Sequence, residues 1–228
     1  MRAGRRRLYL ARHGDVSYYD AEGNVVADPD QVPLNQRGQQ QAKALGDALS
    51  DVTFDCVYHT GMPRTIETAA LIAGTEHPGT ARNALREIAP GQIGHLGHEI
   101  VLRELVYGFE LANEPGAQFA RGERFAEFYD RISAGTDLLL GESWSTCLLV
   151  AHSGTNRAML SYLCRMGPGG MSHFEQDAGC LNVIDVDELA DSSRQTLIRL
   201  ANFTPSAPVP KGDRRTSLER MFANRDRD

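Results

Sequence analysis

Near the start of the chain lies the stretch LYLARHG, from Leu8 to Gly14. Its first four residues are apolar or aromatic and favour a short buried strand, and the glycine indicates the turn that ends it. The strand then delivers Arg12 and His13 to the carboxyl end of a sheet, where open α/β sheets bind ligands. A neutral imidazole is a competent nucleophile and a guanidinium group clamps phosphate, so the triplet is a candidate anion site. Taken alone, an arginine and a histidine in a loop can equally be a chance pair.

A second strand of this kind lies late in the chain. The run TCLLVA at Thr146–Ala151 is almost wholly apolar and predicts the clearest buried strand of the sequence. It leads directly into His152, Ser153 and Gly154, and apolar residues at helical spacing then predict a helix over Asn156–Met166. The sequence therefore holds two strand–histidine–turn units whose histidines are expected at the same edge of the sheet.

A third strand end leads to an arginine. Phe54–Tyr58 is predicted to be a buried strand, and Pro63, after the following turn, suits the first turn of a helix. Arg64 lies in that first turn, where a cation opposes the helix dipole. Arg64 can simply be a solvent-exposed arginine at the start of a helix. Its unfavourable interaction with the helix dipole mildly favours a functional role.

The remaining segments continue the alternation of strands and helices. Residues 15–32 form a polar loop, and Asn35 is a suitable N-cap for the helix that follows. A further strand is predicted over Ala81–Ile88, with Glu87 near its end, and a broken helical pattern from His98 to Leu140 is expected to pack over one end of the sheet. The last two predicted strands form a hairpin at a sheet edge and span Cys180–Val186 and Gln195–Phe203.

This alternation predicts an α/β fold, a three-layer α/β/α sandwich with a mainly parallel central sheet and an antiparallel edge strand. Residues 1–203 are expected to form this domain. From residue 204 the composition changes to proline and then to mixed charge, which predicts a tail over residues 204–228 with one short helix around Ser217–Phe222.

Composition narrows the range of partners. The 228 residues carry a net charge of -6, which argues against a general nucleic-acid binder. No apolar run is long enough to span a bilayer, and the basic residues at the N-terminus precede an apolar run, Leu8–Ala11, that is too short for a signal peptide. A cytoplasmic protein with no membrane partner is expected. The four cysteines form no CxxC pair and favour buried thiols over disulfides or a zinc site.

Five blocks of the sequence, in order, resemble one known family. They are LARHG at Leu10–Gly14, PLNQRGQQQA at Pro33–Ala42, RTIETA at Arg64–Ala69, RE at Arg86–Glu87 and VAHSG at Val150–Gly154. In this order they resemble the histidine phosphatase superfamily, the phosphoglycerate mutase-like group, over roughly residues 8 to 186. The triplet at Arg12–Gly14 is weak evidence by itself, whereas the five blocks together are specific.

The resemblance implies a role for each matching residue. His13 is expected to be the nucleophile that forms a phosphohistidine, and Glu87 to protonate the leaving oxygen and then to activate water. The side chains of Arg12, Arg64 and His152 are expected to hold the phosphoryl oxygens. The backbone N–H of Ser153 is expected to add a hydrogen bond. Two arginines supply the positive charge that a metal supplies elsewhere, so neither a metal nor another cofactor is expected.

The sequence departs from the family pattern around the expected pocket. Val16 and Tyr19 stand where the family usually carries side chains that form hydrogen bonds, and the loop after Gly91 is unusual. His95 and His98 are spaced to share a helical face around a metal, but no matching cysteine or aspartate cluster accompanies them, which favours surface or pocket-lining roles. These departures leave the substrate open among sugar phosphates, phosphoglycerates, phosphoserine, nucleotides and phosphoproteins.

The expected function is a metal-independent phosphomonoesterase that acts on a small phosphorylated metabolite. The family's mutases tend to carry a longer insertion between the acid and the second histidine than the interval between Glu87 and His152 provides. A mutase of the phosphoglycerate type and a weakly catalytic phospho-ligand binding protein both stay open as alternatives. A pure binder would need the arginines but not His13 or Glu87. The sequence also leaves open whether the chain forms a homodimer.

Overall fold

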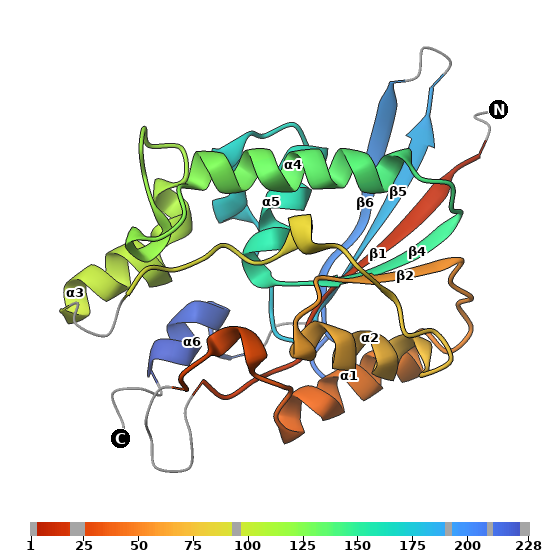
Figure 1. Ribbon diagram of the computed structural model, residues 1–228, viewed down its shortest axis with the longest axis horizontal. Coiled ribbons are helices and arrows are strands. Elements are labelled where there is room, and N and C mark those ends of the chain that lie inside the picture. The colour runs from red at the N-terminus through yellow and green to blue at the C-terminus, as the bar shows by residue number, and fades with distance from the viewer. Residues whose placement is uncertain (1–3, 19–25, 93–96, 190–192, 209–211, 224–228) are drawn as a thin grey trace.

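The computed structural model describes residues 4–18, 26–92, 97–189, 193–208 and 212–223 (Figure 1). Within these ranges six strands form one sheet in the order β3-β2-β4-β1-β5-β6. The strands are β1 (Arg6–Arg12), β2 (Cys56–His59), β3 (Thr80–Ala81), β4 (Thr146–Ala151), β5 (Leu181–Glu188) and β6 (Arg194–Phe203). The first four are parallel, β5 runs antiparallel to β1, and β6 pairs with β5 as a hairpin at the edge. The mainly parallel sheet and the hairpin are as predicted.

Both faces of the central strands are buried, which explains why β4 has a continuous apolar sequence. Leu149 faces one apolar cluster, which also contains Phe128 and Met159, whereas its neighbour Leu148 faces a second cluster, which contains Leu45. Helices α1 (Gln36–Ala48) and α2 (Pro63–Ala73) cover the second face, and α4 (Phe125–Gly141) and α5 (Ser153–Leu163) cover the first (Figure 1). The predicted three-layer sandwich is confirmed.

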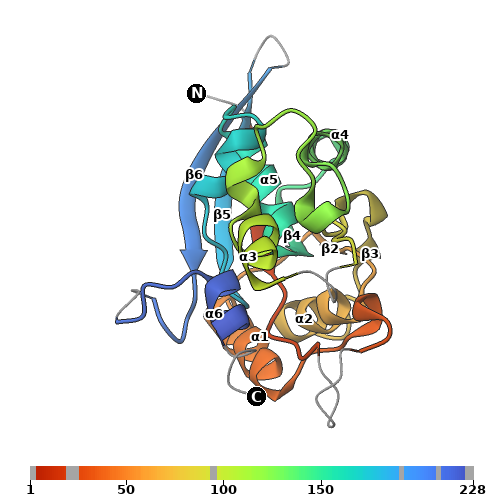
Figure 2. The ribbon, with the colours of Figure 1, turned by 90° about the vertical axis from the view of Figure 1, so that its left-hand side faces the viewer.

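Shorter elements complete the described chain. They are η1 (Pro29–Gln31), η2 (Asn83–Leu85), α3 (His98–Val101), the π-helical turn η3 (Leu102–Val106), η4 (Gly108–Leu111), η5 (Phe119–Arg121), η6 (Pro168–His173) and α6 (Ser217–Ala223). The two views show α3 and α6 as neighbours beyond the carboxyl ends of β1 and β4 (Figures 1 and 2). None of the helices in the described ranges is long and apolar enough to cross a membrane.

The strand expected over Ala81–Ile88 is wrong. Only Thr80–Ala81 pairs with β2, and the chain then forms the 3₁₀ turn η2. Leu85 and Ile88 are both almost fully buried, so the apolar residues recur every third position and not every second one. The helical turn satisfies that spacing.

The helix predicted over Asn156–Met166 begins earlier, at Ser153, and ends at Leu163. His152 is the N-cap residue of this helix and has extended backbone angles, but its side chain accepts no hydrogen bond from the first turn. The carboxylate of Glu87 accepts the N–H groups of Gly154 and Thr155 instead. A helix start that is stabilised by a distant residue carries no local capping signal.

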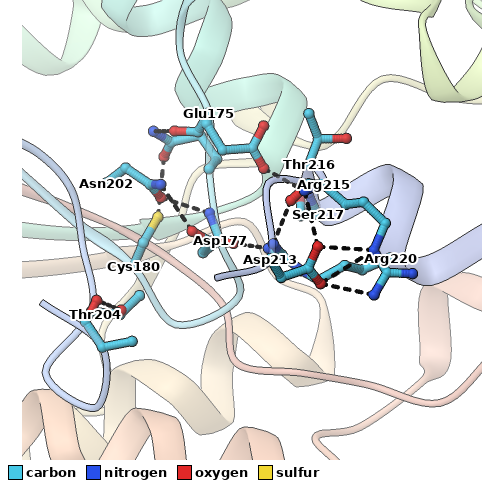
Figure 3. A network of polar contacts seen from close by, with 12 residues as sticks. Glu175, Asp177, Cys180, Asn202, Thr204, Asp213, Arg215, Thr216, Ser217 and Arg220 are labelled. Atoms are coloured by element: carbon cyan, nitrogen blue, oxygen red, sulfur yellow. Dashed lines mark hydrogen bonds and ion pairs between the residues drawn. The ribbon is translucent and has the colours of Figure 1, made fainter. Parts of the chain in front are cut away.

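The C-terminal segment returns to the main body of the fold. The N–H of Ser217 donates to Glu175 Oε1 at 2.8 Å, and Arg220 forms an ion pair with Asp177 (Figure 3). The hydroxyl of Tyr107 donates to Glu219 in the first turn of α6. These contacts fix α6 beside residues 175–177, a loop that also contacts Arg12.

Candidate active site

His13 lies directly after β1, and its N–H donates to the carbonyl of Ala151 at 3.0 Å. Its ring Nδ1 lies 2.7 Å from the carbonyl oxygen of Gly14, which can only accept, so Nδ1 carries the hydrogen and donates it. Burial, together with the positive charges of Arg12 and Arg64, holds the pKa of His13 well below its usual value. The ring is therefore neutral at pH 7 and keeps a lone pair on Nε2.

His152 follows β4, the strand that pairs with β1, and its ring stands edge to face with that of His13. The ring centroids are 5.2 Å apart. Burial is also the main cause that lowers the pKa of His152 well below its usual value, followed by His13 and by the arginines Arg64 and Arg12. Two strand ends that are distant in sequence thus bring both predicted histidines together.

A chain of hydroxyl groups fixes the ring of His152. The hydroxyl of Thr65 donates to the carbonyl of Met62 at 2.8 Å, so it accepts from Thr60, whose Oγ1 lies 3.2 Å away. Thr60 Oγ1 then accepts from His152 Nε2 at 2.7 Å. The hydrogen of the neutral ring is therefore on Nε2. Thr60 is not among the site residues predicted from the sequence, although its position directly after β2 is a signal that could have found it.

Arg12 and Arg64 are each anchored by their terminal nitrogens. Arg12 Nη1 donates to the carbonyl of Gln176, and Arg64 Nη1 donates to the carbonyl of Pro29 at 2.9 Å. The Nε atoms of both arginines and Nδ1 of His152 are buried without any hydrogen-bond partner in the described part of the chain. Buried polar atoms are rarely left unpaired, so the two arginine Nε–H donors indicate a site for an oxyanion, which His152 Nδ1 can also contact once it carries a hydrogen.

The turn after His13 depends on a close backbone approach. The N–H of Gly14 donates to Thr68 Oγ1 at 3.2 Å, and the Thr68 hydroxyl donates to the carbonyl of Arg64 at 2.7 Å. A Cβ atom on Gly14 would overlap the carbonyl of Gly38 in α1. Glycine at this position therefore lets the histidine turn pack directly against α1 and α2.

The side chain of Glu87 reaches the N-terminus of α5, beside His152. Its Oε2 accepts from the N–H of Gly154 at 3.0 Å, and its Oε1 accepts from Thr155 at 3.1 Å and from Ile88 at 3.0 Å. A Cβ atom on Gly154 would overlap the carboxylate. The structure thus brings Glu87 to the same helix start as the second histidine.

Of the other residues that the sequence places near the site, the structure describes some and not others. Ser153 is buried at the start of α5 with its hydroxyl 3.4 Å from Arg157 Nε, and the use of its N–H toward a phosphoryl group stays a prediction. Tyr19 and His95 lie outside the described residues. Val16 pairs with Leu34 in an isolated bridge. The described residues contain no group of three or more side chains suited to hold a metal.

Comparisons with known proteins identify the family of the chain. The family model of the histidine phosphatase superfamily (branch 1) matches residues 8–196. The adenosylcobalamin/alpha-ribazole phosphatase of Salmonella typhimurium is 28% identical over 191 residues, which cover 80% of this chain and 91% of that protein. Phosphoserine phosphatase 1 of Hydrogenobacter thermophilus is 28% identical over 204 residues, which cover 87% of this chain and 92% of that protein.

A solved structure gives the same result for the fold. The crystal structure of the alpha-ribazole phosphatase of Shigella flexneri superposes with a TM-score of 0.67 and 26% sequence identity. The match covers 86% of this chain and 96% of that chain. The chain therefore belongs to the histidine phosphatase superfamily and is a phosphatase of that type.

Proposed function

We propose that the chain hydrolyses a small phosphate monoester, without a metal, through a phosphohistidine intermediate on His13. The observation that carries the proposal is the pairing of a neutral, buried imidazole with unpaired donors. His13 presents an Nε2 lone pair, while Arg12 Nε and Arg64 Nε have no partner within the described residues. This is the combination that phosphoryl transfer to nitrogen requires.

In the first step the lone pair on Nε2 of His13 attacks phosphorus, and the bond between phosphorus and the ester oxygen breaks. Glu87 gives its proton to the departing oxygen, so the alcohol leaves neutral. In the second step Glu87 takes a proton from water, the oxygen of that water bonds to phosphorus, and the N–P bond breaks. Inorganic phosphate leaves, and His13 returns to its neutral form.

Charge on the transferring group is held by Arg12, Arg64 and His152. Their positions are fixed before substrate binds, by Gln176, Pro29 and Thr60 respectively. Preorganised donors of this kind supply much of the catalysis of phosphoryl transfer, which needs little covalent help. We propose that no metal takes part because Arg12 and Arg64 are permanent cations.

The substrate is proposed only as a class. The relatives are named for different substrates, alpha-ribazole and phosphoserine, so we propose a small phosphorylated metabolite. The net charge of -6 disfavours nucleic acid and other long polyanions.

The first experiment is hydrolysis of p-nitrophenyl phosphate in the presence of a metal chelator, by the wild type and by His13→Ala. Chelator-resistant activity that disappears in the variant is the expected result, with a ³²P-labelled acid-labile protein adduct in the wild type. Near-normal turnover by His13→Ala would refute the mechanism. An inactive wild type that still binds phosphate would favour a mutase or a phospho-ligand binding protein, which a phosphoglycerate assay separates.

A further inference from the structure

The backbone that carries Glu87 is held by an arginine of α4. Arg131 Nη1 donates to the carbonyl of Ala84 at 2.9 Å and to that of Arg86 at 3.0 Å, and its Nη2 lies 3.5 Å from the carbonyl of Glu87 itself. Three carbonyl groups of one short segment therefore converge on a single guanidinium group.

Glu123 completes this arrangement. Its carboxylate accepts from Arg131 at 2.9 to 3.1 Å and also from the N–H of Ala89 at 3.1 Å. The N–H of Glu123 donates to the carbonyl of Ala89 at 2.8 Å. Arg131 and Glu123 together thus hold the chain on both sides of Glu87, from residue 84 to residue 89.

The same segment is also held by α5. The hydroxyl of Thr155 lies 3.2 Å from the carbonyl of Leu85 and 3.3 Å from that of Arg86, and the N–H groups of Gly154 and Thr155 hold the Glu87 carboxylate. The carboxylate is therefore fixed by α5, and the backbone behind it is fixed by α4.

We infer that Arg131 and Glu123 are positioning residues for Glu87, and that they set the efficiency of proton transfer to the leaving oxygen. The inference rests on the proposed role of Glu87. A partly exposed ion pair usually contributes little to stability. The planar guanidinium group, however, forms hydrogen bonds in fixed directions, which lysine cannot reproduce. Leu85 and Ile88 are buried and are expected to keep the segment folded in an Arg131 variant, so the expected loss is in the position of Glu87 and not in the fold.

The reaction itself offers a readout of this geometry. A good leaving group departs without a proton, whereas a poor one needs the acid, so a misplaced Glu87 slows only the poor ones. A variant that merely loosens the fold lowers the rate for every ester by the same factor. The value of kcat/KM is the appropriate measure, because it reports transfer to His13 and not the later hydrolysis of the phosphoenzyme.

The experiment measures kcat/KM for 2,4-dinitrophenyl, p-nitrophenyl and phenyl phosphate in five proteins: the wild type, Arg131→Lys, Glu123→Gln, Glu87→Gln and the double variant of Arg131→Lys with Glu87→Gln. Arg131→Lys is expected to lose about tenfold or more on phenyl phosphate relative to 2,4-dinitrophenyl phosphate, with unchanged inhibition by sulfate. Glu123→Gln is expected to lose less in the same direction. In a double variant, Arg131→Lys is expected to add no further leaving-group dependence to Glu87→Gln.

Arg124→Lys is the matched control. Arg124 precedes the first residue of α4 and pairs with Glu127 at 3.8 Å across the helix surface. It is expected to show no leaving-group dependence. An equal loss on all three esters in Arg131→Lys and Glu123→Gln, or no loss, would overturn the inference while Glu87→Gln still shows the dependence. A Glu87→Gln variant without that dependence would instead refute the proposed role of Glu87, and the inference with it.

Discussion

His13 and His152 stand edge to face with their ring centroids 5.2 Å apart, and each ring is fixed through a different nitrogen. His13 donates from Nδ1 to the carbonyl of Gly14, whereas His152 donates from Nε2 to Thr60. The free atoms are therefore Nε2 of the first ring and Nδ1 of the second. The neutral His13 is ready to attack, while His152 can donate to an oxyanion only after it gains a proton.

Anion binding is therefore expected to take up a proton at His152. Sulfate is the appropriate probe because it does not titrate near neutral pH. Its affinity is expected to fall as pH rises from 6 to 8, by up to about tenfold per pH unit. Titration calorimetry in buffers of different ionisation enthalpy measures the proton directly. An affinity that does not depend on pH would contradict the assigned hydrogen positions.

The hydroxyl chain behind His152 predicts the effect of one substitution. Thr60→Val removes the acceptor of His152 Nε2 and leaves a buried N–H unpaired. We expect kcat/KM to fall by roughly tenfold, since an unsatisfied buried donor costs about 1–3 kcal/mol. Thr60→Ser keeps the hydroxyl and is expected to stay within a factor of about three of the wild type. Equal losses in both variants would show that shape, and not the hydrogen bond, matters at this position.

Both histidines also predict how stability changes with pH. Their pKa values are lowered in the folded protein, so the unfolded chain binds more protons between the folded pKa and the usual value of 6.5. The free energy of unfolding is therefore expected to decrease as pH falls below about 6.5, by up to about 1.4 kcal/mol per pH unit for each histidine. Urea denaturation of the wild type and of His13→Gln measures this. A slope for His13→Gln equal to that of the wild type would refute the lowered pKa of His13.

Gly154 offers a test of the Glu87 position that does not change Glu87. A methyl group in Gly154→Ala would overlap the carboxylate, so turnover of p-nitrophenyl phosphate is expected to fall by about 10²-fold. Gly141→Ala, at the end of α4, is the control because its new Cβ meets no atom within 4 Å. It is expected to retain wild-type turnover. A fully active Gly154→Ala would contradict the placement of the carboxylate against α5.

Oxyanion binding is also expected to stabilise the protein through Arg64. Millimolar phosphate should raise the melting temperature of the wild type, because it binds only the folded chain. Arg64→Gln removes a permanent cation whose Nε is buried without a partner among the described residues, and is expected to lose this shift. Arg103→Gln, at an exposed position far from both histidines in the sequence, is expected to keep it. Differential scanning fluorimetry measures both.

The sequence predicts those parts of the site that local patterns encode. The boundaries of β4 were correct because every residue from Cys147 to Ala151 is buried, and Asn35 caps α1 through Gly38 as expected. Each of the five predicted catalytic residues carries a motif in the sequence. The structure brings His13, His152 and both arginines together at the strand ends, which the alternation of strands and helices already implies.

What could not be predicted depends on contacts between distant segments. The early start of α5 is stabilised by Glu87, which lies far away in the sequence, and the turn at η2 replaces a strand because Leu85 and Ile88 pack under α4. Thr60 acts through the ring of His152, which follows another strand, β4. Periodicity reports which side of an element is buried, but it does not report which neighbour supplies a hydrogen bond.

The parallel pairing of β1 with β4 has a consequence for how the protein is made. Residues Arg7 to Arg12 of β1 pair with Thr146 to Ala151 of β4. The strand that presents His13 therefore lacks this partner until most of the chain has been synthesised. Until then the imidazole of His13 is hydrated, and it titrates as an ordinary histidine. The reactive group is thus created only when β4 joins β1, and a nascent or truncated chain that ends before β4 carries the nucleophile without its reactivity.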